Sequence, residues 1–304
     1  MINLSKIKTQ SIKKRKNKIK IEDFSKISND IEGLLPDVLA AKDIREFVKR
    51  LIKAHKEKKQ IIVMIGAHVI KCGLNPLLID LMEKKIITAL AMTGSGVIHD
   101  TEVAMIGATS ESVEEGIVDG TYGVAEETSV FINEAVNDSD KGFGEAVAKK
   151  IVESKLKYEK HSLLATAYKL NIPVTVHVAI GTDIIHMHPS FDAEKTGKST
   201  GIDFKKFIEI VSKLDQGVII NFGSAVIMPE VFLKALNTAR NLGFKIENLT
   251  TANFDMIYQY REKVNIVQRP VIKSGKGYNF TGHHEIMIPL LYYLINEELK
   301  WIKP

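Results

Sequence analysis

The chain of 304 residues contains one cysteine, one tryptophan and only eight prolines. The single cysteine, Cys72, excludes an intramolecular disulfide framework of the kind that small secreted domains need. No apolar run approaches the roughly 20 residues of a membrane-spanning helix. The N-terminus is polar and rich in lysine, unlike a secretory signal peptide. We therefore expect a cytoplasmic protein that does not bind a membrane.

The net charge of +5 is small, but basic residues concentrate in the run 13–20. No aromatic residues alternate with this run, as stacking on bases would require, so we do not expect nucleic acid as a partner. A solvated arm explains the run without a nucleic-acid partner. The sequence predicts an N-terminal arm over residues 1–30 and one α/β domain over residues 31–304.

Short apolar runs alternate with amphipathic stretches along the domain. Residues 61–65 and 86–92 are nearly unbroken apolar runs, which is typical of strands buried on both faces of a parallel sheet. We predict further strands at 174–180, 217–222 and 246–252, and helices at 36–54, 74–84, 145–170, 202–214, 230–242 and 285–298. Residues 188–201 and 273–281 read as loops. This alternation predicts a doubly wound, largely parallel α/β sheet of Rossmann-like type.

Two predicted strands are followed by turns of small residues, Gly66-Ala67-His68 and Thr93-Gly94-Ser95-Gly96. Ligands of open α/β sheets bind outside the carboxyl ends of the strands. Glycine lets backbone N–H groups approach a phosphate, and a following helix N-terminus favours negative charge. These turns therefore predict a nucleotide site, although the dinucleotide fingerprint G-x-G-x-x-G is absent.

Seven of the nine histidines fall at predicted strand ends or in the loops beyond them: His68, His99, His177, His186, His188, His283 and His284. Histidine titrates near neutral pH and binds metals, so this concentration suits proton transfer or a metal site. His99, His186 and His188 could supply three zinc ligands, but no metal-binding signature accompanies them. We therefore predict no metal, and interpret His177 as a core residue.

Several segments resemble the deoxyhypusine synthase family. Residues 73–100 match, without a gap, the family segment that ends in Thr-x-x-Gly-Val-x-x-Asp. Residues 171–188 are similar to its strand Asn-x-Ile-Pro-Val and the following Gly-Asp-x-Ile loop. Further similar segments are 216–224, 251–255 and 286–291. The resemblance covers about residues 30–300.

The resemblance implies an NAD-binding homo-oligomer, a tetramer in that family, with an N-terminal segment packed on a neighbouring subunit. It also implies that Asp183 contacts an amine substrate and that His188 matches a family histidine. The resemblance also implies cofactor contacts from Asp183 and from residues in or near the strand-end turns: His68, Cys72, Thr93, Gly94, Ser95, Gly96, Gly223, Ser224, Thr251 and Ala252.

The sequence departs from this family at the residues of its reaction. The family transfers a butylamine group through an imine on the lysine of a Trp-Gly-Lys motif. That motif is absent, and its place falls near Arg269-Pro270. Arginine stays protonated and cannot form the imine. Lys273 and Lys276 are the nearest replacements, and Ile98-His99 stands where the family has two glutamates.

We therefore predict a deoxyhypusine synthase-like, NAD-binding transferase or oxidoreductase for a small amine- or hydroxyl-bearing substrate, rather than an authentic deoxyhypusine synthase. His99 would act as general base or as a substrate ligand, Asp183 would orient the substrate, and Lys273 or Lys276 would be the nucleophile. The remaining predicted substrate contacts are Asp100, His186, His188 and His283. The alternatives are an NAD-independent metal-dependent hydrolase or lyase that uses the histidines, and a non-catalytic nucleotide-binding protein.

Overall fold

A computed structural model describes residues 2–300, and its contacts divide the chain between Arg45 and Glu46. The first unit holds the 3₁₀ turns η1 (Leu4–Lys6), η2 (Ile12–Lys14) and η3 (Ile21–Asp23), and helix α1 (Ile31–Leu34). Helix α2 (Leu39–Lys56) begins in this unit. No side chain in residues 2–34 is buried. Residues 2–34 therefore contribute no buried side chain, whereas Ile44 of α2 is buried.

The second unit is built on a parallel sheet. Within residues 46–300 six strands lie in the order β3-β2-β1-β4-β5-β6, and every neighbouring pair is parallel. Strands β2 and β3 therefore lie to one side of β1, and β4, β5 and β6 lie to the other. This order confirms the predicted doubly wound fold, with its switch point between β1 and β4. The strands are β1 (Ile61–Ile65), β2 (Ala89–Thr93), β3 (Val174–His177), β4 (Val218–Phe222), β5 (Thr250–Asp255) and β6 (Lys276–Thr281).

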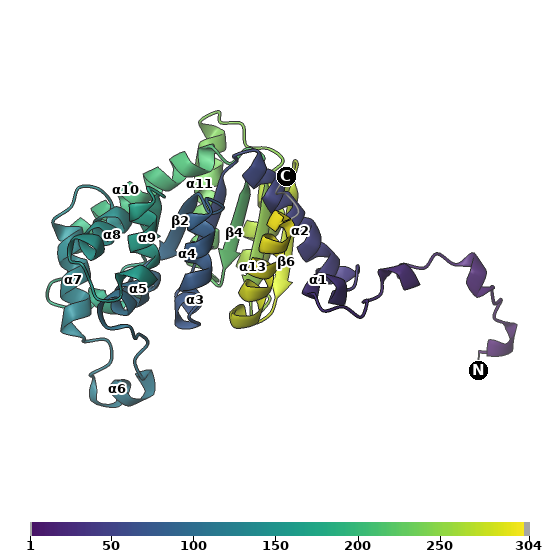
Figure 1. Cartoon of the computed structure of the whole chain (residues 1–304), viewed down its shortest axis with the longest axis horizontal. Coiled ribbons are helices and arrows are strands. Elements are labelled where there is room, and N and C mark those ends of the chain that lie inside the picture. Colours follow the sequence, from purple (N-terminus) through teal and green to yellow (C-terminus); the bar gives the residue numbers. More distant parts are fainter. Residues whose placement is uncertain (1, 301–304) are drawn as a thin grey trace. The chain divides into compact units, whose positions relative to one another are not determined.

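Helices cover both faces of this sheet (Figure 1). On one face Phe207 of α10 and Phe232 of α11 pack against Ile62 and Met64 of β1. On the other, Figure 1 shows α4 and α13 in front of the strands. Helices and turns are α3 (His68–Lys71), α4 (Asn75–Glu83), α5 (Gly94–Ile106), α6 (Val113–Asp119), α7 (Glu126–Asn137), α8 (Phe143–Glu153), η4 (Glu159–His161), α9 (Leu163–Lys169), η5 (Ile184–His186), α10 (Ala193–Ser212), α11 (Ile227–Asn241), α12 (Tyr260–Glu262), the π-helix η6 (Lys263–Gln268), η7 (Arg269–Val271) and α13 (His284–Lys300).

Three sequence-based element predictions were wrong. The helix predicted for residues 145–170 is two helices, α8 and α9, separated where Lys155 adopts a left-handed φ of +50°. Helix α10 begins within the predicted loop 188–201. The predicted loop 273–281 contains strand β6, whose Gly277 lies so close to η6 that an added Cβ would meet the carbonyl oxygen of Val267 at 1.9 Å. The lysine and glycine residues of this segment made it resemble a loop in the sequence.

A buried carboxylate joins three elements behind β3. Asp203 of α10 is fully buried, and it accepts hydrogen bonds of 2.8 Å from the backbone N–H groups of Gly144 and Val176. Burial raises the pKa of Asp203 to about 7, although these two hydrogen bonds favour the charged form. Asp203 therefore links α8, α10 and β3 while holding its proton in the folded state.

We expect Asp203→Asn to change how stability depends on pH. The folded wild type holds this proton up to about pH 7, whereas the unfolded chain releases it near pH 4, so unfolding free energy falls as pH rises through this window. The amide variant has no such proton. Urea denaturation across the window should show the variant gaining stability relative to wild type. Parallel pH profiles would contradict this, and the exposed control Asp138→Asn should follow wild type.

Candidate functional site

Two glycine turns meet at the switch point, where β1 and β4 end. An added Cβ on Gly66 would lie 2.7 Å from the carbonyl oxygen of Gly223. Gly223 itself has a φ of +64°, and a Cβ there would lie 2.6 Å from the ring of His284. Both positions therefore exclude side chains for steric reasons, and Gly223 also needs a left-handed backbone.

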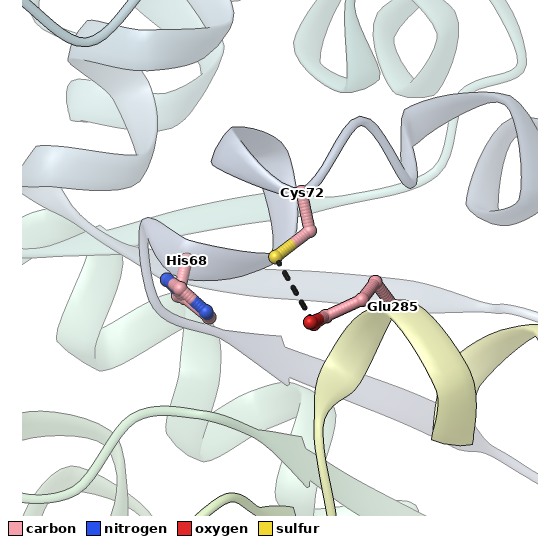
Figure 2. A group of neighbouring side chains, drawn as sticks. All are labelled: His68, Cys72 and Glu285. Atoms are coloured by element: carbon pink, nitrogen blue, oxygen red, sulfur yellow. Dashed lines mark hydrogen bonds between the residues drawn. The ribbon is translucent and has the colours of Figure 1, made fainter.

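A histidine–cysteine–glutamate cluster adjoins these turns (Figure 2). His68 begins α3, Cys72 is the C-terminal cap of α3, and Glu285 comes from the first turn of α13. The Cys72 Sγ lies 3.7 Å from Glu285 Oε2. Burial raises the pKa of the Cys72 thiol, and the charge of Glu285 raises it further, so this sulfur is a thiol rather than a thiolate.

His284 lies directly behind this cluster. Its ring centroid is 5.4 Å from that of His68, and the residue is 1% exposed. Its Nε2 is 3.2 Å from the carbonyl oxygen of Phe254, which makes Nε2 the donor. Its Nδ1 is buried and has no partner among the described residues. Burial lowers the pKa of His284, which favours the neutral ring.

A second part of the site lies where α5 begins, after β2. The carboxylate of Asp183 occupies the N-terminus of this helix, so close to Gly94 that an added Cβ would be 2.1 Å from Oδ2. Burial raises the pKa of Asp183 to about 6, although a hydrogen bond from the backbone N–H of Ser95 acts to lower it. The helix dipole accommodates this partly buried negative charge.

A cavity of about 110 Å³ opens beside Asp183. His99, Glu102 and Lys71 are among its lining residues. His99 Nδ1 is 2.6 Å from the hydroxyl of Thr109, which donates to Glu102. Burial opposes ionisation of Glu102, yet its hydrogen bonds with His99 and Thr109 lower its pKa overall. Since drug-sized ligands need about 300 Å³ or more, this cavity suits a small polar group.

The sequence did not reveal a buried polar network at the ends of β4 and β5. Asn221 donates to Asn253 at 2.8 Å, and Asn253 donates to Glu262 at 3.1 Å. Burial raises the pKa of Glu262 to about 9, assisted by the neighbouring Asp255, so Glu262 is protonated at neutral pH. The asparagines and Asp255 in these strands could have indicated a polar network. Glu262 could not be assigned to it from the sequence, because it lies several residues after β5 ends.

Both predicted nucleophiles, Lys273 and Lys276, lie far from the glycine turns. Lys276 begins β6 and Lys273 precedes it, so both lie at the amino end of the parallel sheet, opposite the glycine turns. Their amines pair instead with Glu46 and Glu247. The cause is the unrecognised strand β6, which places residues 273–276 at its beginning rather than in a loop beyond its end.

Other predicted residues have structural positions. Asp100 is fully buried and receives hydrogen bonds from Asn75, Ser162, Leu163 and Leu164, which leaves no contact for a substrate. Burial raises the pKa of Asp100 to about 6. Two predicted cofactor contacts, Thr251 and Ala252, lie in the interior of β5, which continues to Asp255.

The three histidines considered as zinc ligands, His99, His186 and His188, do not form a metal-ligand cluster among the described residues. His186 Nδ1 accepts hydrogen bonds from the backbone of Gly181 and Asp183, and so holds their turn. His188 pairs with Ser190, and His99 belongs to the cavity described above. His283 is exposed near Glu285. Of the residues predicted to bind cofactor, the glycine turns bring His68, Cys72, Gly223 and Ser224 together, whereas Thr93, Gly94, Ser95 and Gly96 adjoin Asp183.

Comparison with known proteins supports the fold and leaves the function open. No family model and no curated protein matches the chain. A complex of AgrE with ornithine and NAD+ is similar, with a TM-score of 0.55 and 14% identity over 86% of this chain and 33% of that one. The chain thus spans about a third of AgrE.

Two further structures are similar over most of their length. A protein assigned to the LOR/SDH group in Methanococcus maripaludis S2 has a TM-score of 0.55 and 16% identity, over 94% of this chain and 75% of that one. A protein assigned as a deoxyhypusine synthase in Entamoeba histolytica has a TM-score of 0.51 and 11% identity, over 84% of this chain and 87% of that one. The deoxyhypusine synthase resemblance is therefore supported at the level of the fold.

The close packing of Gly94 and Asp183 predicts a strong coupling between these positions. Gly94→Ala should destabilise the protein, because its Cβ must displace the carboxylate from the start of α5. In an Asp183→Ala background the same change should be milder, although the 3.0 Å contact with Val178 remains. Urea denaturation of the four proteins should give a coupling energy of about 0.5–3 kcal/mol. Additive effects would contradict this packing.

Proposed function

We propose that the protein is an NAD-binding enzyme, a transferase or oxidoreductase, for a small amine- or hydroxyl-bearing substrate. The meeting of Gly66 and Gly223 at the switch point carries this proposal. Doubly wound sheets bind nucleotides at that point, where turns without side chains admit a pyrophosphate. AgrE, which is similar in fold, has been crystallised with NAD+, and this is consistent with such a use of the fold.

The residues at the switch point fit a dinucleotide. Helix α11 follows Gly223 and Ser224, and the Ser224 hydroxyl accepts from the Met228 N–H at 3.2 Å. Ser224 satisfies one donor at the start of this 15-residue helix, and the positive end of the helix favours phosphate. The start of α5 fits phosphate poorly, because the carboxylate of Asp183 is already there.

The cavity beside Asp183 supplies the groups that a small substrate needs. Bound NAD would accept a hydride from the substrate. Asp183, with a pKa of about 6, is ionised at neutral pH and can take a proton from a substrate amine or hydroxyl. His99 and Glu102 offer further hydrogen bonds. A transfer reaction through an imine would use Lys71, the lysine that lines this cavity, rather than Lys273 or Lys276.

Calorimetric titration with NAD tests the binding part of the proposal. Wild type should bind one NAD per chain, and Gly66→Ala should weaken binding at least about tenfold, because its Cβ forces the two turns apart. Gly197→Ala is the matched control, since an added Cβ there meets nothing within 4 Å. Absence of NAD binding by wild type, or equal affinity in folded Gly66→Ala protein, would contradict the proposal.

Turnover with a panel of small amines and alcohols tests the reaction. NADH formation should appear with at least one member, and its rate should rise as pH increases through about 6, where Asp183 loses its proton. Asp183→Asn should lower kcat by about 10²–10⁴-fold while NAD affinity is retained. Tight NAD binding without any product would favour the non-catalytic alternative, and unchanged kcat in the variant would exclude Asp183 as the base.

A further inference from the structure

The cluster of His68, Cys72 and Glu285 contains three kinds of metal ligand. One ligand atom from each, an imidazole nitrogen, a thiol sulfur and a carboxylate oxygen, lies within 4.8 Å of the other two. It is the one such group identified within residues 2–300. Zinc binds these donor types, and catalytic zinc sites commonly have three protein ligands and an open fourth position. The mixed donors distinguish this group from a surface patch of carboxylates.

The spacing of the cluster is close to that of a tetrahedral site. Zinc bonds of about 2.3 Å to sulfur and about 2.1 Å to oxygen place these two ligands about 3.5 Å apart. The observed distance between Cys72 Sγ and Glu285 Oε2 is 3.7 Å. Figure 2 shows both side chains directed toward each other, with His68 beside them. Small side-chain rotations therefore suffice to bring all three donors onto one ion.

The backbone holds two of the ligands in place. His68 and Cys72 are four residues apart in α3 and its C-terminal cap, so their side chains share one side of the turn. The Cys72 N–H donates to the His68 carbonyl at 2.9 Å, which fixes this relation. Glu285 is held by the first turn of α13, which packs against α3.

A second observation points to a ligand at this place. His284 packs against His68 and is 1% exposed, yet its Nδ1 has no hydrogen-bond partner in the described part of the chain. An unpaired polar atom in such a position is unfavourable, and buried polar atoms in proteins are normally paired. This unpaired nitrogen is therefore available to a polar ligand, such as a metal-bound water, next to His68.

We propose that His68, Cys72 and Glu285 bind one zinc-like divalent ion, with the fourth position open to water or a substrate oxygen. The ion replaces the Cys72 proton and bridges α3 to α13. It stands beside the glycine turns, at the carboxyl end of the sheet. This proposal departs from the sequence-based prediction that no metal binds, and it does not require NAD to bind.

Cobalt titration of the metal-free full chain tests this site. The protein should bind one Co²⁺ with a thiolate-to-metal absorption band, and added Zn²⁺ should displace it. Cys72→Ser should remove the band, and His68→Gln and Glu285→Gln should each weaken binding at least about tenfold. Matched controls are His55→Gln and Glu298→Gln, which alter a histidine in α2 and a glutamate in α13 outside the cluster. Circular dichroism checks that every variant folds.

Three results would overturn the proposal. These are no Co²⁺ bound at one equivalent, binding without the sulfur band, or a band whose affinity is unchanged in His68→Gln and Glu285→Gln. Metal affinity is measured without nucleotide, and NAD affinity is measured on metal-free protein. A metal site without NAD binding therefore contradicts only the proposed function, and NAD binding without a metal site contradicts only this inference.

Discussion

The contact between two backbone turns, at Gly66 and Gly223, governs the arrangement of the candidate site. These turns follow β1 and β4, the neighbouring strands at which the sheet reverses direction of growth. The two turns approach so closely that no space remains for a Cβ at Gly66, and the ring of His284 leaves no space for one at Gly223. The same contact brings α3, α11 and α13 to one place, although they are far apart in the sequence.

The site combines the close contact of two glycine turns with titratable groups near it. His68, Cys72 and Glu285 lie next to the turns, and Asp183 lies at the start of α5. The protein keeps its own carboxylate at that helix N-terminus, so a ligand phosphate is better accommodated near α11. The small residues at the two places look alike in the sequence, but the start of α5 holds a carboxylate of the protein itself.

The sequence predicted the fold well because the central strands carry strong local signals. Residues 61–65 are apolar throughout, and all five are buried in β1. Strand β6 was missed because Lys276 and Gly277 resemble a loop, and only Tyr278 and Phe280 pack into the aromatic cluster around Phe254. The nucleophile prediction failed with it, since the direction of one strand decides at which end of the sheet a lysine lies.

Site residues on the central strands were easier to predict than those that depend on contacts distant in sequence. The turn at Gly66 was visible as small residues after an apolar run, whereas Gly223 was named through the family resemblance. The spacing of His68 and Cys72 was also visible, but their partner Glu285 is more than 200 residues away, and only the fold brings it near. Asp100 was misassigned because the donors from residues 162–164 cannot be inferred from its own neighbourhood.

A crystal structure of the protein soaked with NAD would test the central claim most directly. The account predicts density for the pyrophosphate over the Gly66 and Gly223 turns, near the start of α11, with the nicotinamide toward Asp183. Pyrophosphate density at the start of α5, in place of the Asp183 carboxylate, or at the amino end of the sheet, would contradict it.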